Sequence, residues 1–145
     1  MSNIWDKFDK EIDTDFQKDI ENAENQEFVE VPHGEYEVKV QQMELKISKS
    51  GNPMLSIWFK IVAGDYNNNL IFMNQVLNIP FQISISNKIL RGLAPEKEIS
   101  FETYSQYANL IMDIFEEIDG KFEYALKYGE KKGFNTFEIL DIFEV

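Results

Sequence analysis

The residues of this sequence whose types and spacing suggest chemistry are aromatic and basic. The side chains of residues 53–63 are predicted to alternate between the two faces of a strand. Trp58 and Lys60 then lie on one face, opposite an apolar set formed by Leu55, Ile57, Phe59 and Ile61. An indole beside an ammonium group can stack on a nucleic-acid base while the ammonium group contacts a phosphate. Stacking contributes roughly 1–3 kcal/mol per base and accepts any base. This face therefore indicates sequence-tolerant binding of single strands.

Further candidates lie in a neighbouring predicted strand and beside two predicted hairpin turns. Residues 70–78 place Phe72 and Asn74 on one face, which we expect to point outward, although a core position for Phe72 stays open. Lysines flank the turns at 48–52 and 129–133. The candidate nucleic-acid-binding residues are Lys39, Lys46, Lys49, Trp58, Lys60, Phe72, Asn74, Lys127, Tyr128, Lys131 and Lys132.

Each of these candidates has a plainer interpretation. Trp58 can be covered by the N-terminal helix or by a second subunit, and the lysines can be ordinary turn residues. Basic loops together with a tryptophan on a polar face indicate nucleic-acid binding more strongly than any one of these residues does. We therefore treat the set as one hypothesis.

Catalytic signals are weak throughout the chain. There is no cysteine and only one histidine, His33, so thiolate chemistry and multi-histidine metal sites are excluded. No nucleophile elbow or phosphate loop occurs. Residues 13–15 resemble the start of a calcium loop, but the required glycine and terminal glutamate are missing. We expect a protein that is not an enzyme and has no cofactor and no metal.

Charge is distributed unevenly along the 145 residues, whose formal net charge is −12. Residues 1–34 hold three lysines and ten acids, and residues 138–145 hold three acids and no base. Residues 96–119 carry seven acids and one lysine. In contrast, residues 39–60 hold four lysines against one acid, and residues 121–132 hold four against two. Because screening acts over roughly 8–10 Å, such patches act locally despite the net charge.

Hydrophobic periodicity predicts a five-stranded domain behind a helical segment. In the first strand, apolar positions alternate up to Val40 and resume at Met43 with shifted phase, which predicts a β-bulge near Gln41 and Gln42 and a bent strand. Pro80 suits the start of a helix, and Gly120 suits the end of another. The predicted strands are 35–47, 53–63, 70–78, 121–128 and 134–143, and the predicted helices are 80–93 and 103–118.

Five strands with a helix between the third and fourth have the connectivity of the OB-fold. A bent first strand suits a small barrel, because that strand pairs at both of its ends. We therefore predict a mainly β, OB-like barrel over residues 31–145. OB-folds bind oligonucleotides on the face around the second and third strands and with two hairpin loops.

The first 30 residues are predicted to form a separate acidic, amphipathic helical segment with a linker. Apolar residues recur every four positions, at Ile4, Phe8, Ile12, Phe16 and Ile20. That stripe needs a cover, either the barrel itself or a second copy of the chain. The acidic ends suit recruitment of a partner protein, and the N-terminal segment also suits a DNA mimic that lies over the basic groove.

Five segments of the sequence together match a known pattern: VPHGEYEVKVQQMEL (31–45), GNPMLSIWFKIVAG (51–64), LIFMNQV (70–76), YGEKKGFNTFEI (128–139) and the opening NIWDKFDKEID. In these segments the sequence resembles a family of small bacteriophage proteins described as single-stranded DNA-binding proteins. One departure is residues 67–69, three asparagines where relatives are expected to have Lys-Gly.

This resemblance implies an OB-type fold and sequence-tolerant binding of single-stranded DNA during phage replication or recombination. The expected partners are single-stranded DNA and phage replication or recombination proteins. The expected location is the cytoplasm of the infected bacterium, because no apolar run is long enough for a membrane span. The competing hypothesis is an acidic protein-interaction module, either a DNA mimic or an adaptor for a replication partner.

Overall fold

The computed structural model describes Gln17 and residues 30–145. The chain divides between Glu30 and Val31, and the unit described below is Val31–Val145. The predicted acidic helix of the first 30 residues lies outside the described residues, apart from Gln17.

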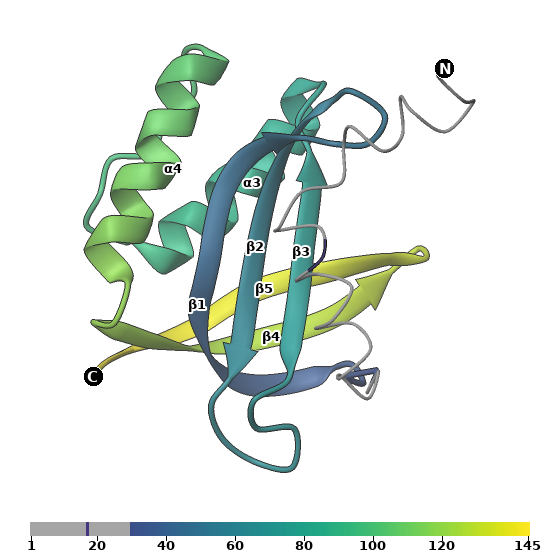
Figure 1. Cartoon of the computed structure of the whole chain (residues 1–145), viewed down its shortest axis with the longest axis vertical. Helices are drawn as coiled ribbons and strands as arrows, with labels where there is room; N and C mark the ends of the chain where they lie inside the picture. The colour runs from purple at the N-terminus through teal and green to yellow at the C-terminus, as the bar shows by residue number, and fades with distance from the viewer. Residues whose placement is uncertain (1–16, 18–29) are drawn as a thin grey trace, which may run out of the picture. The chain divides into compact units, whose positions relative to one another are not determined.

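The described unit is mainly β, as predicted, with two helices between the third and fourth strands (Figure 1). All neighbouring strands pair antiparallel in a single five-stranded sheet of order β3-β2-β1-β4-β5. Within residues 30–145, β3 and β5 are the two edges of this sheet and do not pair with each other, so a closed barrel does not form. The elements are β1 (Gly34–Ile47), β2 (Pro53–Ile61), β3 (Leu70–Val76), α3 (Pro80–Leu93), α4 (Tyr104–Ile118), β4 (Phe122–Lys131) and β5 (Phe134–Glu144).

Strand β1 joins the two halves of the sheet. Its first residues pair with β4, its later residues pair with β2, and Val38 pairs with both. The register with β2 shifts between Val40 and Gln42, which leaves Gln41 as the extra residue of a β-bulge. The predicted bulge is therefore confirmed. The bend lets β4 and β5 cross behind β1, β2 and β3 (Figure 1).

The core lies between the two halves of the sheet and the helices. The predicted apolar face of β2 is fully buried. The two helices are joined by Tyr107, whose hydroxyl donates to Asn87 Oδ1 at 2.6 Å and lies 2.8 Å from Ser86 Oγ. Tyr124 on β4 donates to the carbonyl of Leu93 at 2.7 Å, where α3 ends. These buried hydroxyls fix the two helices to each other and α3 to β4, because breaking either contact would leave an unpaired buried polar group, which is costly.

Helix α3 begins at Pro80 and ends at Leu93, as the sequence predicts. Helix α4 begins one residue later than predicted because Thr103 is its N-cap, with Oγ1 accepting from the backbone N–H of Gln106 at 3.1 Å. Gly120 follows α4 with a positive φ of 73°, a conformation that glycine adopts without strain.

The hairpin between β4 and β5 differs from the prediction of a five-residue turn at 129–133. Strand β4 continues to Lys131, which pairs with Phe134. Only Lys132 and Gly133 form the turn, with φ values of 54° and 83°. Two consecutive positive φ values suit the tight turns that match the twist of an antiparallel ribbon. The hairpin is therefore longer and its turn shorter than the sequence pattern predicted.

Candidate nucleic-acid interface

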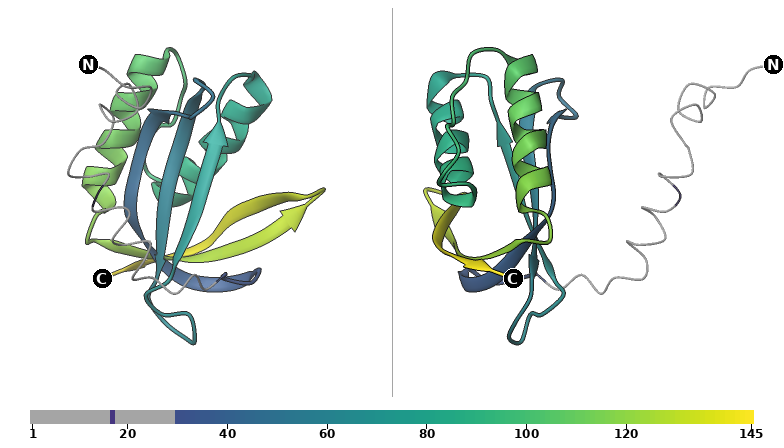
Figure 2. Two further views of the ribbon diagram at one scale, coloured as in Figure 1. Left: turned by 45° about the vertical axis from the view of Figure 1, so that its right-hand side comes forward. Right: turned by 90° about the vertical axis from the view of Figure 1, so that its left-hand side faces the viewer.

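The surface of β1, β2 and β3 that faces away from the helices is named the outer face here. Helices α3 and α4 and the β4–β5 hairpin all lie on the other side of these three strands (Figure 2). Among the elements that the structure describes, none covers the outer face.

Strand register assembles the candidate side chains into rows on this face, because directly paired residues point the same way. Trp58 lies opposite Phe72 on β3 and opposite Gln42 on β1. One row along, Lys60 lies opposite Lys39. Towards the other end, Ser56 lies opposite Asn74 and Glu44, and Lys46 lies opposite Met54.

Trp58 and Phe72 form an aromatic pair near the centre of the outer face. Their ring centroids are 5.5 Å apart and their planes are nearly perpendicular, at 83°. Phe72 is 48% exposed and Trp58 is half-buried, whereas Ile71 and Met73 are buried on the opposite side of β3. The outward orientation predicted for Phe72 and Asn74 is therefore confirmed. Edge-to-face contact holds the two rings in place while leaving ring surface open to solvent.

Lysines surround this aromatic pair without carboxylate partners. Lys39 and Lys46 are exposed, and Lys60 is half-buried beside Trp58. Lys49 lies in the turn between β1 and β2, which bends towards the outer face (Figure 2). Within residues 30–145, basic side chains approach carboxylates at two places, His33 with Glu130 at 4.0 Å and Lys97 with Glu117 at 2.8 Å, so these four ammonium groups face no described carboxylate at contact distance.

The remaining candidates form a second group on the β4–β5 hairpin. Lys127, Lys131 and Lys132 are exposed there, but the hairpin lies behind the outer face and its tip projects beyond β3 (Figures 1 and 2). Tyr128 points to the core side of β4, since its ring stacks on Phe137 with centroids 5.4 Å apart. The structure therefore does not bring the four hairpin residues onto the same face as Trp58.

Two polar residues of the outer face were not among the predicted site residues. Gln42 directly follows the bulge and is the register partner of Trp58. Its amide donates to Glu44 Oε1 at 3.3 Å. The phase shift that predicted the bulge also moves Gln42 onto the face of Lys39, so the signal was present in the sequence. Gln42 can offer its amide to a base edge or a phosphate, whereas Glu44 adds one negative charge beside Lys46.

The asparagine turn at 67–69 has a structural explanation. Asn68 has a φ of 74°, and its backbone N–H donates to the carbonyl of Ile61 at 2.8 Å. Asparagine tolerates this left-handed conformation better than most residues. It therefore closes the loop between β2 and β3 without the glycine expected in relatives.

Within the described part of the chain, no group of three or more histidines, cysteines or acids is arranged to hold a metal ion. None of the helices in that part has both the length and the apolar character that crossing a membrane requires.

A family model for the description "Protein of unknown function (DUF669)" matches residues 18–113 of this sequence. The chain belongs to this family. The match contains the whole outer face, from β1 through β3, and helix α3, but it ends within α4, before the β4–β5 hairpin. No curated protein matches the sequence.

Proposed function

We propose that this protein binds single-stranded DNA on the outer face, without catalysis and with little preference among bases. The observation that carries the proposal is the partly exposed pair of Trp58 and Phe72, with Lys39 and Lys60 on one side and Lys46 on the other. The rings would stack on bases, and the ammonium groups would neutralise phosphates. The resemblance to phage single-stranded DNA-binding proteins supports the same function.

The arrangement of the strands also supports an OB-type fold for this function. Strands β1, β2 and β3 pair in sequence, β4 returns to the start of β1, and the helices lie between β3 and β4. This is the order of an OB barrel in which the contact between β3 and β5 is absent, and OB barrels are often partly open. In such folds the face around β2 and β3 and the loop between β1 and β2 bind oligonucleotides.

The biological setting that we propose is phage replication or recombination in the cytoplasm of the bacterial host. Single strands are exposed there, and a protein that binds any sequence protects them. The acidic ends of the chain would then recruit other replication proteins. They would also keep DNA from binding to the rest of the surface, since like charges repel phosphates.

The test is a fluorescence anisotropy titration of labelled oligo-dT with the full chain at two salt concentrations. We expect saturable binding that weakens with salt by about 0.7 log unit per log salt for each phosphate contacted. A labelled duplex of the same length is the control and should bind more weakly, because its bases are not available for stacking.

Absence of binding to oligo-dT at low salt would overturn the proposal. If the protein instead competes with DNA for another DNA-binding protein, the acidic interaction module would be the correct function. The titration of oligo-dT and this competition measurement together separate the two functions.

A further inference from the structure

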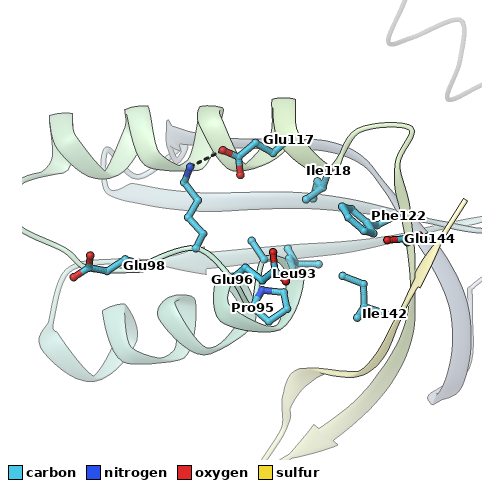
Figure 3. A pocket seen from close by; sticks show the side chains of 11 residues that line it. Leu93, Pro95, Glu96, Glu98, Glu117, Ile118, Phe122, Ile142 and Glu144 are labelled. Carbon is cyan, nitrogen blue, oxygen red and sulfur yellow. Dashed lines mark hydrogen bonds and ion pairs between the residues drawn. The ribbon is translucent and has the colours of Figure 1, made fainter.

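A pocket of about 680 Å³ lies on the helix side of the sheet, away from the outer face (Figure 3). Its apolar lining comes from the end of α3, the end of α4 and the paired ends of β4 and β5. Leu93 and Ile118 are buried there, whereas Phe122 and Ile142 are half-buried. Pockets of this size accommodate a drug-sized molecule or a few adjacent side chains of a peptide.

The rim of this pocket is acidic. Glu96, Glu98, Glu117 and Glu144 line it, and Lys97 is the basic residue among the lining side chains. Helices α3 and α4 both end at this pocket, so their carbonyl ends add partial negative charge. The electrostatic field at the pocket therefore favours a cation and disfavours a phosphate.

Lys97 shows how the rim holds an ammonium group. Its Nζ lies 2.8 Å from Glu117 Oε1, so that the side chain bridges the loop after α3 and helix α4 (Figure 3). Three further carboxylates on the rim make no ion pair within residues 30–145. The pocket thus carries more negative charge than its own lysine neutralises.

We propose that this pocket binds a basic segment of a partner protein, in which a lysine or arginine is flanked by apolar residues. The basic side chain would bind the rim carboxylates, and an apolar neighbour would pack on Phe122 and Ile142. Charge complementarity selects a basic partner, and the apolar lining selects one whose cation adjoins a hydrophobic side chain. The pocket is too large for a single ammonium group, which favours a peptide over a small amine.

This inference is independent of DNA binding, because α3 and α4, whose ends line the pocket, lie on the opposite side of β1, β2 and β3 from the outer face (Figure 2). A partner in the pocket would leave Trp58 accessible. The protein would then hold a basic protein segment and a nucleic acid at the same time.

The probe is a short fluorescein-labelled peptide of alternating leucine and arginine, titrated with the full chain. The double variant Glu96→Gln, Glu144→Gln should bind it at least fivefold more weakly. The matched control is Asp113→Asn, Glu116→Gln, which makes the same change in net charge at exposed positions of α4 outside the lining. The control should bind like the parent. Equal weakening in both variants would overturn the proposal, because it would show that only net charge matters.

A second pair of variants tests the role of Lys97 in the opposite direction. Lys97→Met removes the pocket's own cation and should raise affinity for the peptide about threefold or more. Lys88→Met makes the same charge change at an exposed position of α3 outside the pocket and should leave affinity unchanged. No difference between the two would contradict the proposal.

A peptide of alternating serine and arginine tests the apolar lining. It should bind the parent protein more weakly than the leucine peptide. Equal affinity would contradict the contribution of Phe122 and Ile142 and would indicate a site for simple cations.

Discussion

The two sides of β1, β2 and β3 differ in packing and in charge. The outer face carries a half-open aromatic pair and lysines without carboxylate partners. The helix side is closely packed, and its pocket is lined by four glutamates and one lysine. A net charge of −12 averages these surfaces and therefore says little about the charge of either one. The positions of the charged side chains determine which surface attracts a polyanion and which repels it.

The packing difference is clearest at two residues. Phe72 is large, apolar and 48% exposed, so its side chain does not contribute to the packing of the core. Gly92 on α3 is instead closely packed, because a Cβ added there would lie 2.8 Å from Cβ of Ile139 on β5. Substitutions on the outer face should therefore change binding, and substitutions on the helix side should change stability.

The largest expected effect is on DNA affinity. Trp58→Ala should weaken binding of oligo-dT about tenfold to a hundredfold at every salt concentration, since stacking on a base contributes roughly 1–3 kcal/mol. Phe72→Ala should weaken it in the same direction, with less risk to the fold because the ring is already exposed. Anisotropy titrations measure both.

The control for the aromatic variants is Phe81→Ala on α3, an aromatic residue that is 69% exposed and lies away from the outer face. It should bind oligo-dT like the parent. If Phe81→Ala weakens binding as much as Phe72→Ala does, the outer face is not the binding surface.

Gly92→Ala should lower the free energy of unfolding by about 1–3 kcal/mol, because the added methyl group overpacks the contact between α3 and β5. Urea denaturation followed by circular dichroism measures this change. The affinity of the folded protein for oligo-dT should be unchanged. Loss of affinity without loss of stability would contradict the separation between the two sides.

Lys39→Gln and Lys60→Gln should each reduce the salt dependence of oligo-dT binding. The expected decrease is about 0.7 in the slope of log affinity against log salt for each phosphate contact that is lost. Lys88→Gln on α3 is the matched control and should leave the slope unchanged. Similar slopes for all three variants would show that the outer-face lysines do not contact phosphates.

The smallest expected effect is a loss of stability at alkaline pH that originates on the helix side. Burial raises the pKa values of Tyr107 and Tyr124 above the ordinary value of 10.0. Above pH 10 these hydroxyls ionise in the unfolded chain and remain neutral in the folded one, so stability falls as pH rises from there. Tyr107→Phe should reduce this fall, measured as the urea midpoint from pH 9 to pH 11. An unchanged fall would mean that Tyr107 does not contribute.

Local patterns predicted local structure well. Alternation in residues 53–63 placed Trp58 opposite the buried side chains, the phase shift located the bulge, and Pro80 located the start of α3. Each of these features depends only on residues that are close together in the sequence. The periodicity of a strand or a helix determines the relative directions of such side chains.

The sequence predicted the relative positions of distant strands less well. Lys127 and Lys60 both point outward from their strands, yet they lie on different sides of the molecule because β1 bends and carries β4 behind β2. The length of the β4–β5 hairpin was also missed, since Gly129 and Gly133 suggested a long turn. Gly129 instead lies in the strand opposite Thr136, and only Gly133 is in the turn.

The most direct test of the central claim uses the fluorescence of Trp58. The sequence has two tryptophans, so Trp5→Phe leaves Trp58 as the only one. In this variant, unlabelled oligo-dT should quench the indole emission and reach saturation at the concentration that saturates anisotropy. Saturated binding with unchanged emission from Trp58 would contradict the account, because the DNA would then lie on another surface.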